Sequence, residues 1–402
     1  MIFLNGISNE ASIPMDVLVK KCCINEFEKI MHANDIEYVK VKSENIINKK
    51  AGNSVHYHHH LNTTIRFDFT KRFYCYDSIR QWVEQTMKKN NILEEIKLGQ
   101  TYEKRDIFVL KLSTGNTKKA VFLMGGEEGK DWASPAILLN FVSSILEKRL
   151  NLEILTRHYD FYVLPLFNPD GYMYSMIKER LWTKNSRVYF PKKPCSENAS
   201  VVGISIDRNW YFNKLTVRNE ECDPIFTGSK PLSEEETIAV SRFLNKIALN
   251  MMAFINIRGF ENLVTIPYGY DKKYCNNFDV LMDMLSAVHD SVLKQHNVTF
   301  NYGLASKYIY NFSGNVADWV KKQLNTPIVY TFYVKKELYV FPSAKDVKPL
   351  TIQISTMIKE ILLLANTFYG PLFNNQLNQC INNAILIITV CFFIMMSICT
   401  DY

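Results

Sequence analysis

The 402-residue sequence has no dense block of lysine and arginine, and this absence argues against a nucleic-acid partner. Its 47 Lys and Arg against 40 Asp and Glu leave a formal net charge of only +7, which is small for this length. With 47% apolar and 22% charged residues, the composition is that of an ordinary globular protein. A disordered chain and a multi-span membrane protein are therefore excluded.

Charged side chains are also missing between Glu360 and Asp401. Within that stretch, residues 385–399 form an apolar run of about 15 residues, shorter than the ~20 that a spanning helix needs. The polar segment 374–383 precedes the run, and this order is typical of a glycosylphosphatidylinositol-attachment signal. A short membrane tail anchor and a buried core helix are the alternatives.

The evidence for export is mixed. Residues 1–14 carry neither the charged start nor the apolar core of a secretory signal. Against that, N-glycosylation acceptor patterns occur at Asn62, Asn198, Asn297 and Asn311. We expect a secreted or cell-surface protein, attached to a membrane through the tail at 371–402.

Nine cysteines cannot all pair with one another, because the number is odd. Cys195 and Cys222 bracket one loop-rich segment and are the candidate disulfide. The alternative is that both are buried free thiols, which are common in cytosolic proteins.

From about residue 66, apolar strand-like segments alternate with helix-like segments, which predicts an α/β domain with a largely parallel sheet. The predicted strands are 108–112, 120–124, 161–167, 253–257 and 330–334, and the predicted helices are 78–89, 134–146, 233–250, 278–293 and 351–365. Residues 168–171 (NPDG), directly after the third of these strands, are predicted to form a turn. Residues 1–65 form a small N-terminal module with a linker, residues 66–370 the large domain, and residues 371–402 a polar spacer with the apolar tail.

Six segments together resemble the zinc carboxypeptidases of the pancreatic A/B type, in the family's order and at about its spacings. They are 101–115 (TYEKRDIFVLKLSTG), 127–136 (EEGKDWASPA), 168–182 (NPDGYMYSMIKERLW), 206–210 (IDRNW), 266–270 (IPYGY) and 309–319 (IYNFSGNVADW). The resemblance implies a single large domain with a mixed, largely parallel twisted sheet flanked by helices. It also implies a shortened α+β pro-segment over 1–65 and a disulfide between Cys195 and Cys222.

The resemblance also assigns the positions of the family's zinc ligands, which are two His and one Glu. Here those positions hold Glu128, Asp131 and Arg258. A guanidinium group has no lone pair to give a metal, so no metal is expected here, although zinc is the family's cofactor.

The family's catalytic positions are changed as well. Tyr333 stands at the general base, and a tyrosine with a pKa near ~10 is a poor base at neutral pH. Thr183 stands where the family has an Arg that stabilises the oxyanion, and Ser205 where an Asp supports the first His. We therefore expect no working catalytic residue.

Our hypothesis for the altered site is that Arg258 replaces the metal as the local positive charge and pairs with Glu128 and Asp131. The alternative is that the three side chains have diverged without connection and point to solvent.

Part of the substrate-binding set persists in the resemblance. Arg208 matches the Arg that binds the substrate's terminal carboxylate, and Tyr310 matches the Tyr that closes over the substrate. Ala317 lies at a specificity-pocket position, where a small residue favours apolar side chains. Asp207 replaces an Asn, and its charge should weaken the pull of Arg208 on a carboxylate. Alternatively, Arg208 only holds its loop and Tyr310 is a packed aromatic.

The sequence thus predicts a catalytically inactive carboxypeptidase-like protein with a residual cleft for peptide or protein C-termini. One alternative is an active metallocarboxypeptidase that releases C-terminal residues from peptides with an unconventional metal site. The other is a surface binding or decoy module.

Overall fold

The computed structural model describes most of the large domain and parts of the N-terminal module. The described residues are 2–3, 17–18, 24–34, 36, 55–56, 67–115, 118–188, 203–210, 223, 225–259, 262–309, 312–334 and 343–369. Several predictions fall outside this set, namely those on Cys195, Cys222, Tyr310, Asn62, Asn198, Asn311 and the apolar run 385–399. None of the helices within the described part is long and apolar enough to cross a membrane.

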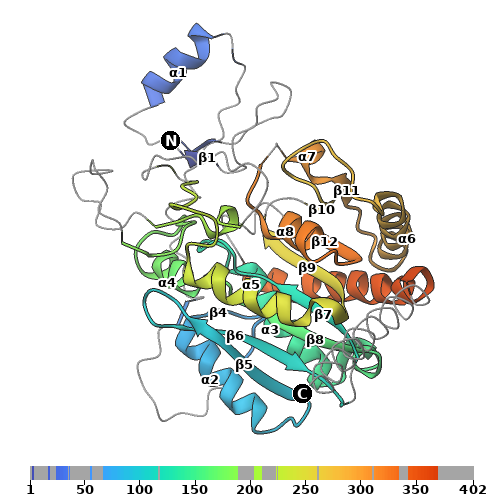
Figure 1. The fold of residues 1–402 in the computed structure, drawn as a ribbon. Coiled ribbons are helices and arrows are strands. Elements are labelled where there is room, and N and C mark those ends of the chain that lie inside the picture. Colours follow the sequence, from blue (N-terminus) through green and yellow to red (C-terminus); the bar gives the residue numbers. More distant parts are fainter. Residues whose placement is uncertain are drawn as a thin grey trace, which may run out of the picture.

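A mixed eight-stranded sheet forms the centre of the domain (Figure 1). In order across the sheet its strands are β11 (Asn301–Leu304), β10 (Leu263–Ile266), β12 (Ile328–Val334), β9 (Met251–Gly259), β7 (Lys119–Met124), β8 (Tyr159–Leu164), β6 (Asp106–Leu112) and β5 (Leu93–Gln100). The central strands β12, β9, β7 and β8 run parallel to their neighbours in this group. The predicted largely parallel α/β fold is confirmed.

Helices cover both faces of this sheet (Figure 1). They are α2 (Tyr76–Met87), α3 (Ala133–Leu146), α4 (Pro169–Ile177), α5 (Glu235–Ile247), α6 (Phe278–His296), α7 (Ala305–Tyr308), α8 (Val316–Gln323) and a final helix that includes 347–369. Successive strand residues point to opposite faces, so each face builds its own core. Val121 and Leu123 of β7 belong to the core that includes residues of α3 and α6, whereas Phe122 and Met124 belong to the core that includes residues of α5 and α8.

The described parts of the N-terminal module are small. The two-residue strands β1 (Ile2–Phe3) and β2 (Val17–Leu18) pair antiparallel, and helix α1 (Ile24–Ala33) follows them in the sequence. Strand β3 (Val55–His56) pairs with β4 (Phe73–Tyr74), which connects the module to the start of the large domain.

The turn predicted at residues 168–171 is in fact the start of α4. Asn168 caps this helix, because its Oδ1 accepts from the backbone N–H of Gly171 at 2.9 Å. Pro169 occupies the first helical position, where its missing N–H costs nothing. An Asn followed by Pro therefore marks a helix start here, which the turn interpretation missed.

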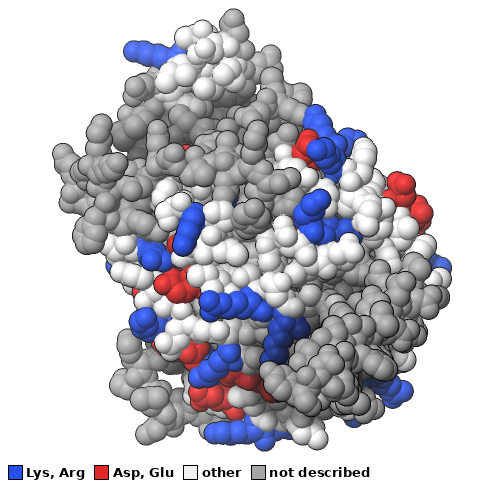
Figure 2. All heavy atoms as spheres, viewed as in Figure 1, with Lys and Arg blue, Asp and Glu red and all other residues white. Residues whose placement is uncertain are grey.

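On the face shown in Figure 2, the basic and acidic side chains of the described residues are interspersed. The mixed pattern fits the small formal net charge of +7.

Candidate functional site

The candidate site lies where the parallel strands β7, β9 and β12 end. Glu127 and Glu128 follow β7, Arg258 is the penultimate residue of β9, and Tyr333 is the penultimate residue of β12. Arg258 and Tyr333 are also paired in the sheet register. Because the carboxyl ends of parallel strands meet at one edge, segments that are far apart in the sequence converge here.

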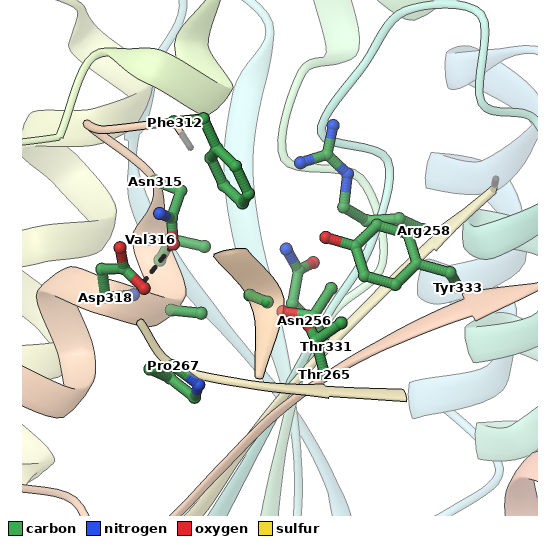
Figure 3. Close-up of a pocket in the computed structure, with 12 residues that line it drawn as sticks. Asn256, Arg258, Thr265, Pro267, Phe312, Asn315, Val316, Asp318, Thr331 and Tyr333 are labelled. Atoms are coloured by element: carbon green, nitrogen blue, oxygen red, sulfur yellow. Dashed lines mark hydrogen bonds between the residues drawn. The ribbon is translucent and has the colours of Figure 1, made fainter. Parts of the chain in front are cut away.

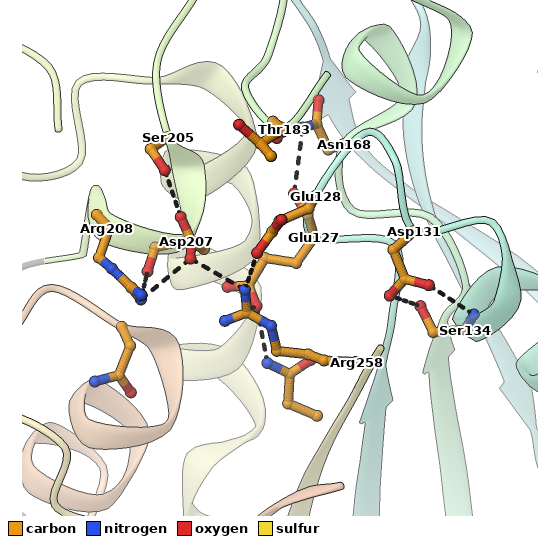
Figure 4. A network of polar contacts seen from close by, with 12 residues as sticks. Glu127, Glu128, Asp131, Ser134, Asn168, Thr183, Ser205, Asp207, Arg208 and Arg258 are labelled. Atoms are coloured by element: carbon orange, nitrogen blue, oxygen red, sulfur yellow. Dashed lines mark hydrogen bonds and ion pairs between the residues drawn. The ribbon is translucent and has the colours of Figure 1, made fainter. Parts of the chain in front are cut away.

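Arg258 is the centre of an ion-pair network (Figure 4). Its Nη1 lies 3.2 Å from Glu127 Oε2, and its Nη2 lies 3.1 Å from Asp207 Oδ2 and also contacts Glu128 Oε1. Arg258 is only 8% exposed, and these three carboxylates raise the pKa of its guanidinium well above the usual value although burial opposes this. The predicted contact between Arg258 and Glu128 is confirmed.

The predicted pairing of Arg258 with Asp131 is wrong. Asp131 is buried, and its two oxygens accept from the backbone N–H of Ser134 at 3.1 Å and from Ser134 Oγ at 2.7 Å (Figure 4). These bonds hold the first turn of α3, and within the described residues Asp131 forms no ion pair with Arg258. The two donors of Ser134, which lie in the same turn, satisfy this carboxylate, and it does not pair with the guanidinium.

Two partners of Arg258 were not predicted as such, Glu127 and Asp207. Burial raises the pKa of Glu127 to about 7, against the lowering effect of Arg258. Burial would also raise the pKa of Asp207, but Arg208, Arg258 and a 2.6 Å bond from Ser205 lower it to about 2. Asp207 is therefore charged at neutral pH. The sequence shows that Glu127 is adjacent to Glu128. This adjacency does not show which of the two side chains faces the site.

The loop that carries Glu128 is held against the chain that follows α4. The backbone N–H of Gly129 donates to the carbonyl of Thr183 at 3.1 Å. A Cβ at Gly129 would lie 2.4 Å from the carbonyl oxygen of Gly171, so only glycine permits this approach. Thr183 thus lies beside the site and takes part through its backbone carbonyl.

Tyr333 is buried at the same edge, and burial raises the pKa of its hydroxyl to about 12. The phenol is therefore protonated at neutral pH and cannot serve as a general base there.

Arg208 contacts both Asp207 and an aromatic ring. Its Nη1 lies 3.1 Å from Asp207 Oδ2, and its guanidinium lies 4.5 Å from the centre of the Phe312 ring. The neighbouring Asn209 ties its loop to Thr227 and other groups through its side-chain amide. Asn209 therefore supports this loop, while the Arg208 guanidinium lies against the Phe312 ring.

A pocket of about 290 Å³, its open mouth included, adjoins the network (Figure 3). It is lined by Asn256, Arg258, Thr265, Pro267, Ala305, Phe312, Asn315, Val316, Ala317, Asp318, Thr331 and Tyr333. We call this set the polar pocket. It contains Ala317, whose position the family resemblance assigned to a specificity pocket.

Among the described residues, one group of three carboxylates has ligand atoms within 4.8 Å of one another, namely Glu234, Glu235 and Glu236 in and beside the first turn of α5. Arg187 Nη1 lies 3.6 Å from Glu234 and 3.3 Å from Glu235. This guanidinium offsets the charges of Glu234 and Glu235, whereas burial raises the pKa of Glu236 to about 8, so that its carboxyl group is mainly protonated at neutral pH.

The family model described as zinc carboxypeptidase matches residues 79–353 of the chain. Carboxypeptidase O of Bos taurus is 29% identical over 272 residues, which cover 66% of this chain and 70% of the relative. Mast cell carboxypeptidase A of Mus musculus is 29% identical over 304 residues, covering 73% of this chain and 71% of the relative.

Solved structures support the same fold. Bovine thrombin-activatable fibrinolysis inhibitor, in complex with tick carboxypeptidase inhibitor, is 26% identical with a TM-score of 0.67, covering 75% of this chain and 99% of that one. A crystal structure of thrombin-activatable fibrinolysis inhibitor is 24% identical with a TM-score of 0.74, covering 87% and 88% of the two chains.

Proposed function

Because the chain belongs to the zinc carboxypeptidase family, we propose that it is a catalytically inactive member that binds peptide C-termini in the family's cleft. The observation that carries this proposal is the contact of Arg258 with Glu127, Glu128 and Asp207. In this proposal, the Arg258 guanidinium supplies the local positive charge that a metal ion supplies in the family.

The residues at the three ligand positions do not fit a zinc ion. Arg258 has no lone pair to donate, and its charge repels a divalent cation placed beside Glu128. The two oxygens of Asp131 are engaged by Ser134. Only Glu128 would remain as a donor from the set, and a single carboxylate is too few for a tetrahedral zinc site.

The groups that would assist hydrolysis are also unsuited to it. The Tyr333 hydroxyl, with its pKa raised to about 12 by burial, is protonated at neutral pH. Thr183 carries no charge that could stabilise an oxyanion. These two features support inactivity independently of the metal question.

Binding of a C-terminal carboxylate is supported by Arg208, whose guanidinium lies against the ring of Phe312, one of the residues that line the polar pocket. A ligand carboxylate has to share this guanidinium with Asp207, whose oxygen lies 3.1 Å away. We therefore expect weak binding that depends on the free carboxylate, since a charge-assisted bond to Arg208 is what the ligand gains.

Metal content and peptide hydrolysis test the inactivity. We expect purified protein to contain far less than one zinc per chain and to release no C-terminal residue from peptides. One tightly bound zinc per chain together with chelator-sensitive release would overturn the proposal. The triple variant E128H/D131E/R258H, which restores two His and one Glu, serves as the positive control for zinc uptake.

Peptide binding is tested separately by calorimetry with one peptide prepared as the free acid and as the C-terminal amide. We expect the acid to bind and the amide to bind at least tenfold more weakly, with the difference lost in R208A. Equal affinity for the two forms would refute the binding half of the proposal.

A further inference from the structure

The three carboxylates at the start of α5, Glu234, Glu235 and Glu236, include one that has no partner. We call these three residues the α5 triad. Each offers one oxygen that lies within 4.8 Å of an oxygen from each of the other two. Glu236 is 0% exposed, and neither its Oε1 nor its Oε2 has a hydrogen-bond partner among the described residues. Buried polar atoms are nearly always bonded, so this carboxyl group, aimed into an acidic cluster, points to a ligand.

The surroundings of Glu236 are themselves acidic. The charges of Glu234, Asp170 and Glu235 all act to raise the pKa of its carboxyl group, in the same direction as burial. Asp170 is already paired with Arg105 at 2.7 Å. In the described part of the chain, Glu236 is therefore a buried acid that no hydrogen-bonded cation compensates.

Arg187 compensates the triad only in part. Its Nη1 lies 3.6 Å from Glu234 Oε1 and 3.3 Å from Glu235 Oε2, and both distances exceed the ~2.7–2.9 Å of a strong charge-assisted bond. Three carboxylates against this one guanidinium leave a formal charge of 1 − 3 = −2 when all three are ionised. A divalent cation carries the charge that balances this excess.

The other two members of the triad are suited to bind an ion. Asn185 Nδ2 donates to Glu234 Oε2 at 2.8 Å and Ser233 Oγ donates to Glu234 Oε1 at 2.8 Å, which holds this carboxylate in position. Each of its oxygens has a second lone pair that these bonds do not use. The Glu235 side chain is 41% exposed, so an ion can reach the triad from solvent on that side.

The donor set and its spacing favour calcium. Carboxylate oxygens are hard ligands, whereas zinc prefers nitrogen and sulfur. Ca²⁺ binds oxygens at ~2.3–2.6 Å, so two oxygens on opposite sides of one ion are about 4.6–5.2 Å apart, and a triad whose oxygens lie within 4.8 Å of one another can contact a single ion. Mg²⁺ needs a smaller, regular octahedron and keeps several waters, for which the buried Glu234 and Glu236 leave little space.

We infer that the α5 triad is a calcium-binding site. Glu236 offers both of its oxygens, Glu234 and Glu235 offer one each, and water completes the coordination on the exposed side of Glu235. The site shares no residue with the Arg258 network, and the inference does not depend on the proposed function.

A proton and the ion are alternatives at Glu236. Burial raises the pKa of this carboxyl group to about 8, so Ca²⁺ that binds at neutral pH releases the proton to solvent. The measurements are therefore made at pH 8, where the proton competes less strongly than at pH 7.

The test is a calorimetric titration of the full chain with CaCl₂, after dialysis against a chelator that is then removed. We expect one Ca²⁺ per chain with a Kd of about 10⁻⁴–10⁻³ M, at the weak end of protein calcium sites, because Arg187 stays close to two of the ligands. MgCl₂ should bind at least tenfold more weakly. No binding of Ca²⁺, or binding of Mg²⁺ as tight as that of Ca²⁺, would overturn the inference.

Two variants locate the ion. E236Q keeps the shape of the buried side chain but removes its charge, and E235Q does the same at the partly exposed member of the triad. We expect each to weaken Ca²⁺ binding at least tenfold. E84Q, at an exposed position of α2, is the matched control and should bind Ca²⁺ like the unmutated protein. If E235Q and E236Q both keep the full affinity, the assignment to the triad is wrong, and E235Q decides this even if E236Q fails to fold.

Discussion

Two buried ion-pair networks in this molecule differ in how fully their polar atoms are satisfied. Asp170 is 0% exposed and accepts from Thr101 Oγ1 at 2.7 Å, from the backbone N–H of Glu103 at 2.9 Å and from Arg105 Nη1 at 2.7 Å. Both of its oxygens are bonded to donors that belong to one tight loop. This network ties α4 to the end of β5 and needs no further group.

The network around Arg258 is different. Three carboxylates share one guanidinium, and Glu127 Oε1 has no hydrogen-bond partner in the described part of the chain. Burial holds the pKa of Glu127 at about 7, whereas Asp207 is held near 2. The comparison teaches that the first network closes a structural loop, while the second gathers acidic groups at a strand edge around one cation, the Arg258 guanidinium.

The largest expected effect comes from removing that cation. In R258A the three carboxylates would remain buried together without their shared partner, and breaking a buried ion pair in this way costs about 3–5 kcal/mol. We expect a loss of this size in the free energy of unfolding at pH 7, measured by urea denaturation. R258K keeps the charge but not the fork of donors, and should lose less. A loss below about 1 kcal/mol in R258A would show that the network is not what compensates these charges.

The second prediction concerns pH, and it separates Glu127 from the rest of the network. Because the folded-state pKa of about 7 lies above the ordinary 4.5, the folded protein holds a proton here that the unfolded chain has released. The stability that this proton provides is present at low pH and is lost as the pH rises to 7. Relative to E127Q, the unmutated protein should therefore be more stable at pH 5 than at pH 7.5, by up to about 3 kcal/mol. Parallel stability curves for the two proteins from pH 5 to 7.5 would contradict this.

A smaller effect is expected in the loop network. R105A removes one donor from Asp170, but Thr101 and the backbone of Glu103 remain bonded to it. We expect a loss of about 1.5–3 kcal/mol in the free energy of unfolding, typical for a hydrogen bond to a charged group. Peptide binding should be unchanged, and a weakened affinity for the free-acid peptide would show that the two networks are coupled.

The smallest effect is expected at the border of the Arg258 network. D207N removes the charge that lies 3.1 Å from Arg208 Nη1 but keeps a side chain of the same shape. We expect the affinity for a free-acid peptide to rise about fivefold, or ~1 kcal/mol, when measured by calorimetry. The gain should vanish in the double variant D207N/R208A. If D207N weakens the binding instead, Asp207 positions Arg208 for the ligand and does not compete with it.

Much of the fold could be predicted from the sequence, because each element carries its own local pattern. The strand expected at 253–257 lies inside β9, and the helix expected at 278–293 is most of α6. Strands β5, β10 and β11 of the sheet were not predicted. β10 and β11 have only four residues each, Leu263–Ile266 and Asn301–Leu304, which is too short to show a period.

The candidate site was predicted in part. The contact between Arg258 and Glu128 followed from charge alone. Charge alone did not show that Asp131 stays apart from them. Its carboxylate is bonded instead to the two donors of Ser134, three residues further along the same turn. Glu127 was missed since only the path of the loop decides that it faces Arg258.

The sequence by itself determined the chemistry that this site can offer. It places an arginine, Arg258, which has no lone pair to give, among acidic residues, and no folding of the chain can change that property. Only the tertiary structure decided which carboxylates meet this arginine. The carboxyl ends of β7 and β9 converge at one edge of the sheet and bring Glu127 and Glu128 within reach of Arg258. The short helical turn at Ile206–Arg208 adds Asp207, while Asp131 is bonded to Ser134 in the first turn of α3.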